Sequence, residues 1–141
     1  MRLSPDILAY HAAQRPALAA ICDALATALG SHLPTAEAKV WHGGPVWFLA
    51  GNPIAGYWSS KHDVRLMFWS GQSFDEADLV ATGKFKAAEV RFASAADVEA
   101  APWPRWLGKA RDIQWDYKNI VKRRGQLEWL VQAAPGDDGP R

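Results

Sequence analysis

The sequence predicts an α+β fold, a two-layer sandwich in which an antiparallel sheet of about five strands carries helices on one face. The stretch from Glu37 to Gly71 concentrates Trp, Val, Phe, Ile and Tyr in short runs separated by Gly, Pro and Asn, which is typical of consecutive antiparallel strands. Helical patterns lie on both sides of this stretch, and one alternating run follows it. Helices packed on one face of a sheet bury both kinds of pattern.

The composition is that of one globular domain, which we place at residues 1–134, with a flexible C-terminal tail at 135–141. A chain of 141 residues buries roughly two thirds of its unfolded surface. The net charge of +1 gives no overall field for nucleic acid or membranes. The single Cys22 excludes an internal disulfide and favours a reducing compartment, and no apolar run approaches a membrane span. We expect a cytoplasmic protein.

Two helices are expected before the sheet. Ser4-Pro5-Asp6 provides an N-cap hydroxyl, a Pro at the first helical position and an acid in the first turn. This helix should end before Pro16, which itself begins a second helix that ends at Gly30. The second helix has an apolar stripe made of Leu18, Ile21, Cys22, Leu25 and Leu29. Its place in the stripe predicts that Cys22 is a buried apolar group rather than a nucleophile.

Four strands are expected to follow as a meander, at residues 37–42, 45–50, 54–60 and 64–70. The turns between them are predicted from their Gly, Pro, Asn and Ser residues. They are Gly43-Gly44-Pro45, Gly51-Asn52-Pro53 and Ser60-Lys61-His62-Asp63.

The rest of the chain is expected to be mainly helical. Ser73 and Glu76 fit a capping box, which predicts a short helix to about residue 80. A fifth strand is expected at 86–93, and a short helix from Ser94 to Pro102. Pro104 should then begin the longest helix, with an apolar stripe that continues to Val121 and with Gly125 after its end.

Because side chains alternate across a strand, each predicted strand divides its residues between two faces. The set assigned to the helix-covered face is almost purely apolar, and consists of Val40, Val46, Phe48, Ile54, Trp58, Val64, Leu66, Phe68, Val90 and Phe92. The opposite set should meet water, yet it mixes aromatic and charged side chains. It consists of Lys39, Trp41, Trp47, Leu49, Tyr57, Arg65, Met67, Trp69, Glu89 and Arg91.

The aromatic content of the second set predicts a surface that something covers. Four rings at roughly 150–250 Å² each present about 600–1,000 Å², whereas the largest apolar patch of a monomer is typically about 300–600 Å². Three candidates can cover it: a C-terminal segment containing Trp129, a second subunit in a homodimer, or a small ligand. Aromatic walls with a few cations favour an anionic or aromatic ligand. The candidate ligand-binding residues are Lys39, Trp41, Trp47, Tyr57, Arg65, Trp69 and Arg91.

The sequence shows no constellation of catalytic residues, and we do not expect an enzyme. His42 and His62 lie in predicted turns and lack a third metal ligand, so no metal site is predicted. Gly43-Gly44-Pro45 lacks the Lys that follows a phosphate-binding loop. The last helix is rich in Lys and Arg, which fits a solvated helix face better than a nucleic-acid interface in a chain of low net charge.

Several short runs are similar to those of a known family. They are Trp41-His42-Gly43-Gly44-Pro45-Val46-Trp47, Lys61-His62-Asp63-Val64-Arg65-Leu66-Met67-Phe68, Thr82-Gly83-Lys84 and Tyr117-Lys118-Asn119-Ile120-Val121. From about Ser4 to Gly125 the chain resembles the YdhG-like family of small bacterial proteins, catalogued mainly as a domain of unknown function. The resemblance implies helices packed on an antiparallel sheet. Some members are described as frataxin-like iron-binding chaperones, which makes iron binding the alternative function that it implies.

The residues themselves favour a different function. The carboxylates in the first helices and first strand are Asp6, Asp23 and Glu37, and hard iron is held by clusters of such oxygen ligands. The sequence therefore predicts first a non-enzymatic domain that binds a small ligand or a partner through the aromatic and basic face of its sheet.

Overall fold

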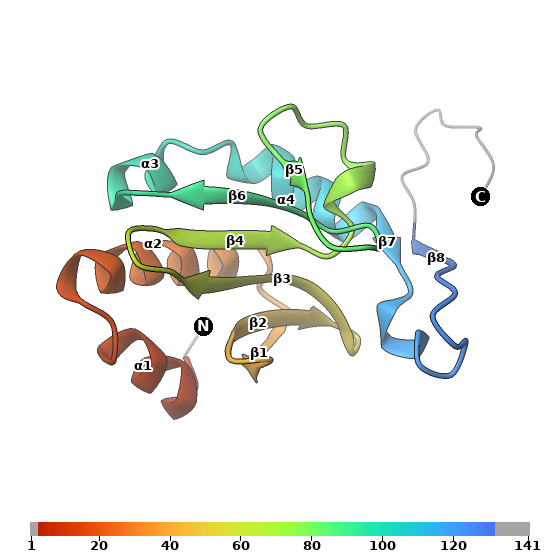
Figure 1. The fold of residues 1–141 in the computed structure, drawn as a ribbon, viewed down its shortest axis with the longest axis horizontal. Coiled ribbons are helices and arrows are strands. Elements are labelled where there is room, and N and C mark those ends of the chain that lie inside the picture. The colour runs from red at the N-terminus through yellow and green to blue at the C-terminus, as the bar shows by residue number, and fades with distance from the viewer. Residues whose placement is uncertain (1–2, 132–141) are drawn as a thin grey trace.

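Six antiparallel strands form the main sheet in a computed structural model of the chain, which describes residues 3–131 (Figure 1). The spatial order of the strands is β1 (Glu37–Trp41), β2 (Gly44–Leu49), β3 (Asn52–Ser59), β4 (Val64–Phe68), β6 (Ala88–Phe92) and β5 (Val80–Ala81). The predicted meander and α+β class are confirmed. The sheet has six strands rather than about five, because β5 pairs with β6 at its edge. The predicted tail at 135–141 lies outside the described residues.

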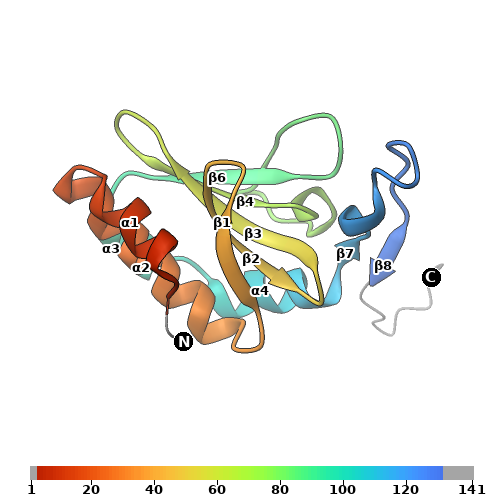
Figure 2. The same ribbon diagram turned by 90° about the horizontal axis from the view of Figure 1, so that it is seen from below.

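The helices pack on one face of this sheet (Figures 1 and 2). They are α1 (Pro5–Ala12), α2 (Pro16–His32), α3 (Ala95–Glu99) and α4 (Trp103–Asp112). The Ser4 hydroxyl accepts a hydrogen bond from the Ile7 backbone N–H (3.3 Å), and α1 and α2 both begin with Pro, as predicted. The apolar stripe of α2 is buried and includes Cys22. None of the helices within residues 3–131 has the length and apolar character needed to cross a bilayer.

The first hairpin turn determines which β2 side chains face the helices. His42 and Gly43 both have positive φ (53° and 82°), so the turn has two residues, and Lys39 pairs with Val46. The predicted three-residue turn would instead have placed Val46 and Phe48 on the face of Val40. Changing the loop by one residue inverts the whole strand. The face assignment of β2 was therefore wrong, and Trp47 lies in the helix-covered core.

The face assignment of β3 was right for Ile54 and wrong for Tyr57 and Trp58, for a related reason. Its register with β2 shifts at Ile54, where a β-bulge adds one residue, and beyond the bulge Tyr57 pairs with Leu66 and Trp58 with Arg65. Tyr57 therefore faces the helices and Trp58 faces away from them. The assignments for β4 and β6 are confirmed, with Val64, Leu66, Phe68, Val90 and Phe92 on the helix side.

The helix predicted at residues 73–80 is absent. Residues Gly71–Ser73 form a single 3-10 turn (η1), and the positive φ of Asp75 (57°) prevents continuation. The Glu76 carboxylate does not close a capping box. It accepts hydrogen bonds from Arg105, Lys109 and the Trp106 indole, at 2.7, 2.7 and 3.1 Å. The contacts of Glu76 with α4 therefore stabilise a non-helical conformation here, although the local sequence fits the start of a helix.

The last helix is shorter than predicted. It ends at Asp112, because Ile113 is extended (φ −127°, ψ 101°). The chain then forms β7 (Gln114–Trp115) and a second 3-10 turn, η2 (Tyr117–Asn119), before β8 (Trp129–Val131) pairs with β7. This C-terminal part lies at one end of the main sheet (Figure 2). The longest helix is therefore α2, with 17 residues.

Candidate ligand-binding site

The sheet face that lies opposite the helices, called the open face below, carries a cluster of aromatic side chains. The side chains on it include Lys39, Trp41, Val46, Phe48, Trp58, Arg65, Met67, Trp69, Glu89 and Arg91. The ring centroid of Trp41 lies 5.4 Å from that of Phe48 and 6.0 Å from that of Trp69, and Trp58 lies 5.9 Å from Trp69. The prediction that both faces of the sheet are apolar is thus confirmed, with a partly different set of residues.

These rings cover one another, so that little of the cluster meets solvent. Val46 is fully buried and Phe48 and Trp69 are 6% and 8% exposed, although no helix covers them. Trp41 remains 37% exposed. The open face is therefore a second small core with an exposed rim.

The Trp58 indole lies flat across two glycines and closes one side of the cluster. A Cβ at Gly44 would lie 2.5 Å from its Nε1, and a Cβ at Gly56 would lie 3.0 Å from its Cη2. The indole N–H donates to the His42 carbonyl (3.0 Å), and the Arg65 guanidinium lies 5.3 Å from the ring centroid. Glycine at both positions is what allows the ring to contact the strand backbone.

A cavity of about 270 Å³ adjoins this cluster on the open face. Arg65, Met67 and Trp69 line it from β4 and the residue after it, and Tyr117 lines it from η2. The remaining lining comes from the loop before β6, here called the 82–87 loop, through Thr82, Gly83, Lys84, Phe85 and Ala87. Figure 2 shows this loop and the C-terminal segment at the same end of the sheet. The cavity thus joins three segments that are distant in sequence.

Hydrogen bonds hold the walls of the cavity in place. The Thr82 N–H donates to the Ala87 carbonyl (3.0 Å), and the Gln72 side-chain amide donates to the carbonyls of Phe85 and Ala87 (2.9 Å each). The Lys86 N–H donates to the Tyr117 hydroxyl (2.9 Å), which ties the loop to the C-terminal segment. Burial raises the pKa of Tyr117, which keeps this hydroxyl protonated.

Asn52 positions Tyr117 from the other side. Its side chain is fully buried, and its amide donates to Gln114 Oε1 and to the Trp115 carbonyl (3.0 Å each) while its oxygen accepts the Lys118 N–H (3.1 Å). These bonds fix the segment from β7 to η2 against the end of β3. The cavity is therefore preformed, as binding sites for small molecules usually are.

The charges on the open face fall into two groups. Arg65 pairs with Glu89 (3.3 Å), Glu89 with Arg91 (3.4 Å) and Arg91 with Asp63 (3.2 Å), so two cations and two carboxylates compensate one another. Lys39, Lys84 and Lys86 form no ion pair within the described part of the chain. Their ammonium groups lie 4.9, 5.4 and 4.9 Å from the ring centroids of Phe48, Phe85 and Trp115.

The structure brings together part of the predicted site. Arg65 and Trp69 line the cavity, Trp41 packs on Trp69, and Lys39 lies over Phe48 in the same cluster. Arg91 is on the open face but is engaged with Glu89 and Asp63, away from the cavity lining. The prediction that Trp47 and Tyr57 contact a ligand on this face was wrong, because both side chains are fully buried on the helix side.

Sequence reasoning missed Lys84, Phe85 and Tyr117 as site residues. Thr82-Gly83-Lys84 lies between the short helix and the fifth strand that the sequence predicts, but nothing local indicates that it folds over the open face. Tyr117 was assigned to a helix. Trp129 was expected to cover the cluster, but the Trp129 ring stacks on Trp115 with a centroid distance of 3.8 Å, and Tyr117 packs on the cluster instead. The chain's own C-terminal segment thus covers part of the open face.

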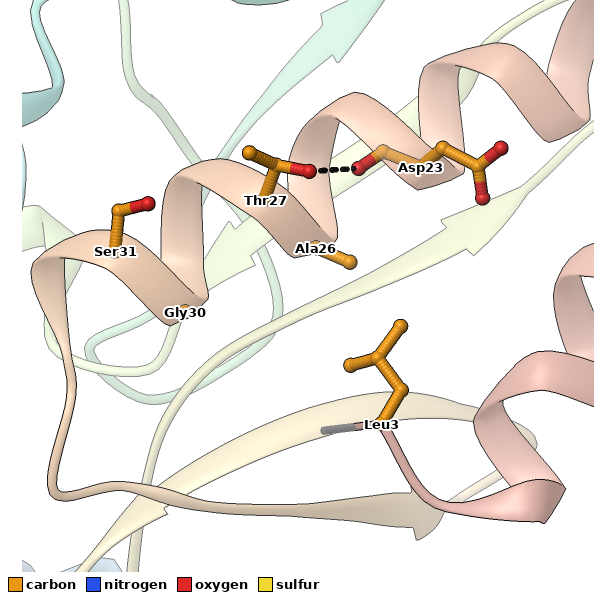
Figure 3. Close-up of a pocket in the computed structure, with 6 residues that line it drawn as sticks. All are labelled: Leu3, Asp23, Ala26, Thr27, Gly30 and Ser31. Carbon is orange, nitrogen blue, oxygen red and sulfur yellow. Dashed lines mark hydrogen bonds between the residues drawn. The ribbon is translucent and has the colours of Figure 1, made fainter. Parts of the chain in front are cut away.

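Among the described residues, further cavities lie on the helix side or at the sheet edge. One of about 400 Å³, between α2 and Leu3, is lined by Leu3, Asp23, Ala26, Thr27, Gly30 and Ser31 (Figure 3). Two of its polar side chains are already engaged, since the Thr27 hydroxyl donates to the Asp23 carbonyl (3.0 Å) and the Asp23 carboxylate lies 2.7 Å from His11 Nδ1. A cavity of about 470 Å³ between α2 and α3 includes Asp23 and Glu99, and one of about 450 Å³ includes Asp75 and Glu76.

Metal and thiol chemistry find little support in the arrangement of side chains. Within residues 3–131, no three or more His, Cys, Asp and Glu side chains are grouped to hold a metal ion. Burial and the neighbouring Asp23 raise the pKa of the Cys22 thiol to about 12, so it behaves as an apolar group.

No protein-family model, no curated protein and no solved structure matches the chain. The similarity to the YdhG-like family and the iron binding that it implies therefore stay predictions.

Proposed function

We propose that the chain is a non-enzymatic binding domain that holds a small molecule in the open-face cavity. The observation that carries the proposal is a preformed cavity with an aromatic floor and two cations, closed by Tyr117 and the 82–87 loop. Aromatic walls with a few polar groups at defined positions are the usual composition of ligand pockets. Arg65 and Trp69, both expected from the sequence to contact ligand, are part of its lining.

The geometry supports a small ligand rather than a large one. A volume of about 270 Å³ lies just below the usual range for ligand pockets, about 300–1,000 Å³, and corresponds to a molecule of one or two rings. Trp69, which lines the cavity, packs in one cluster with the buried Val46 and Phe48, so this wall is rigid. A rigid wall limits the entropy that is lost on binding.

The chain offers a direct probe of this cavity. It contains two methionines, Met1 and Met67, and Met67 lines the cavity. Protein labelled with ¹³C at the methionine methyl groups should therefore give a signal from the site. In a screen of one- and two-ring fragments, we expect a subset to shift the Met67 signal and raise the melting temperature.

Two variants connect such a shift to the cavity. Tyr117→Ala removes a wall, and should abolish or strongly weaken the response of Met67. Leu8→Ala removes an exposed apolar side chain from α1, on the helix side, and should leave it unchanged. Fragments that raise the melting temperature without moving the Met67 signal, or a complete lack of response at millimolar concentration, would contradict the proposed function.

A further inference from the structure

We infer that the ligand of the open-face cavity is an aromatic anion, whose ring lies among Met67, Trp69 and Tyr117 and whose negative group lies at the Nζ of Lys84. The inference rests on the proposed function and adds the chemical class and the orientation of the ligand. It follows from the charges around the cavity, from the different states of its two cations, and from its aromatic walls.

The lining of this cavity differs in charge from those of the three cavities described above. It contains Arg65 and Lys84 and no Asp or Glu. Each of those three linings contains carboxylates, namely Asp23, Asp23 with Glu99, and Asp75 with Glu76. Glu89 lies opposite Met67 beside the cavity, but it already pairs with Arg65 and Arg91. An anion therefore finds a counter-charge in the lining, whereas a cation finds none there.

The two cations of the cavity are not equivalent. Arg65 is half-buried, pairs with Glu89 and lies over the Trp58 ring, so that its charge is compensated and its position fixed. Lys84 is exposed and forms no ion pair within the described residues. Its flexible side chain can therefore turn its ammonium group to an anion at the cavity mouth without breaking an ion pair.

The rest of the lining favours a flat ring. Trp69 is 8% exposed and forms a fixed floor against Trp41 and Trp58. The Tyr117 ring is held by its hydrogen bond to Lys86 and stands at 88° to the Phe85 ring. A ring inserted between these walls can stack on one aromatic face and meet the edge of another, which are the preferred aromatic geometries.

A matched set of probes tests the inference: 2-naphthoate, its neutral analogue 2-naphthamide, and cyclohexanecarboxylate, followed by the methyl signal of Met67. At low salt we expect naphthoate to bind about fivefold more tightly than naphthamide, as one charge-assisted contact at an exposed rim would give. The difference should shrink at high salt. Cyclohexanecarboxylate should bind more weakly than naphthoate, because it has the charge without the aromatic ring.

Substitution of the lysine isolates its contribution. Lys84→Gln should reduce the affinity for naphthoate to that for naphthamide and leave naphthamide unchanged, and Lys84→Glu should reverse the preference. Both changes are at an exposed position and should preserve the fold, which is checked by circular dichroism. Lys61→Gln makes the same charge change at an exposed residue of the β3–β4 turn, outside the cavity, and should have no effect.

The results distinguish this inference from the proposed function. Equal binding of naphthoate and naphthamide, or a preference that survives Lys84→Gln, overturns the anionic class while the cavity remains a binding site. Fragments that shift Met67 while neither naphthyl probe does so overturn the class as well. A Met67 signal that responds to no fragment overturns both.

Discussion

The hydroxyl of Tyr57 lies 2.6 Å from Nε2 of His11, inside the helix-covered core. Nδ1 of the same imidazole lies 2.7 Å from the Asp23 carboxylate, so that this chain of contacts joins β3 to α1 and then to α2. Tyr57 is fully buried and His11 is 5% exposed. Burial raises the pKa of Tyr57, and its O–H remains available as a donor. Tyr57, which the sequence predicted to contact a ligand, instead connects the sheet to its helices.

This contact predicts that Tyr57→Phe destabilises the fold and leaves ligand binding intact. The substitution keeps the ring and leaves Nε2 of His11 buried without a partner, which costs about 1–3 kcal/mol. Urea unfolding at neutral pH measures the loss. The response of Met67 to fragments should be unchanged, since Tyr57 lies on the other side of the sheet. A variant that keeps full stability and loses fragment binding would place Tyr57 at the site.

Replacing Gly by Ala should have opposite effects on stability at Gly44, which the Trp58 ring covers, and at Gly108, which has free space around it. At Gly44, a Cβ would lie 2.5 Å from both the Trp58 ring and the Tyr57 carbonyl, so Gly44→Ala should cost about 1–3 kcal/mol. At Gly108, inside α4, the nearest atom to a new Cβ is 3.8 Å away. Gly108→Ala should therefore stabilise the protein by about 0.5–1 kcal/mol through helix propensity. Thermal unfolding of both variants checks the two signs.

The strands could be predicted from the sequence because their apolar runs and breakers are local signals. The faces of β2 and β3 could not, because each depends on a single residue of register. His42-Gly43 and Gly43-Gly44-Pro45 are both acceptable turn sequences, and only the pairing of whole strands selects the first. The bulge at Ile54 has no mark in the sequence either. β4 and β6 were assigned correctly because an uninterrupted alternation of apolar and polar residues fixes their faces.

The site depends still more on contacts between distant residues. Lys84 and Tyr117 meet at the cavity because Gln72 and Asn52 hold their segments with buried or half-buried hydrogen bonds. Such partners have no signature in local periodicity. The apolar positions after Ile113 continue a helical stripe, yet these bonds and the pairing of β7 with β8 stabilise a different conformation. The general character of the open face could be predicted, and its cavity could not.

Glu76 should make the stability of the protein depend on pH in the acid range. Hydrogen bonds from Arg105, followed by those from Lys109 and Trp106, outweigh the cost of burial and lower the pKa of Glu76 to about 2. A depressed folded-state pKa contributes stability that is fully present above the unfolded value, about 4.3, and is lost as the pH falls toward 2. Urea midpoints measured between pH 6 and pH 2.5 should therefore fall for the wild type.

The variant Glu76→Gln removes the titrating group, so its stability should fall less than that of the wild type as the pH is lowered. At neutral pH it should lower the stability by about 1–2 kcal/mol, because an amide makes weaker bonds to Arg105 and Lys109. Glu99→Gln, at an exposed position of α3, is the matched control and should change neither property. If the wild type and Glu76→Gln lose stability in parallel on acidification, Glu76 is not the group responsible.

Asn52 should control the wall of the cavity from a distance. Asn52→Ala removes three hydrogen bonds, one buried and two partly buried, to the segment that carries Tyr117, and should cost about 2–3 kcal/mol. Because the Lys86 N–H depends on the Tyr117 hydroxyl, its hydrogen exchange should become faster in the variant. Asn119→Ala loses only bonds to the neighbouring Asp116 and should leave this exchange nearly unchanged. Equal protection of the Lys86 amide in the wild type and in Asn52→Ala would show that Tyr117 is held by other contacts, and fragment binding should then also survive the substitution.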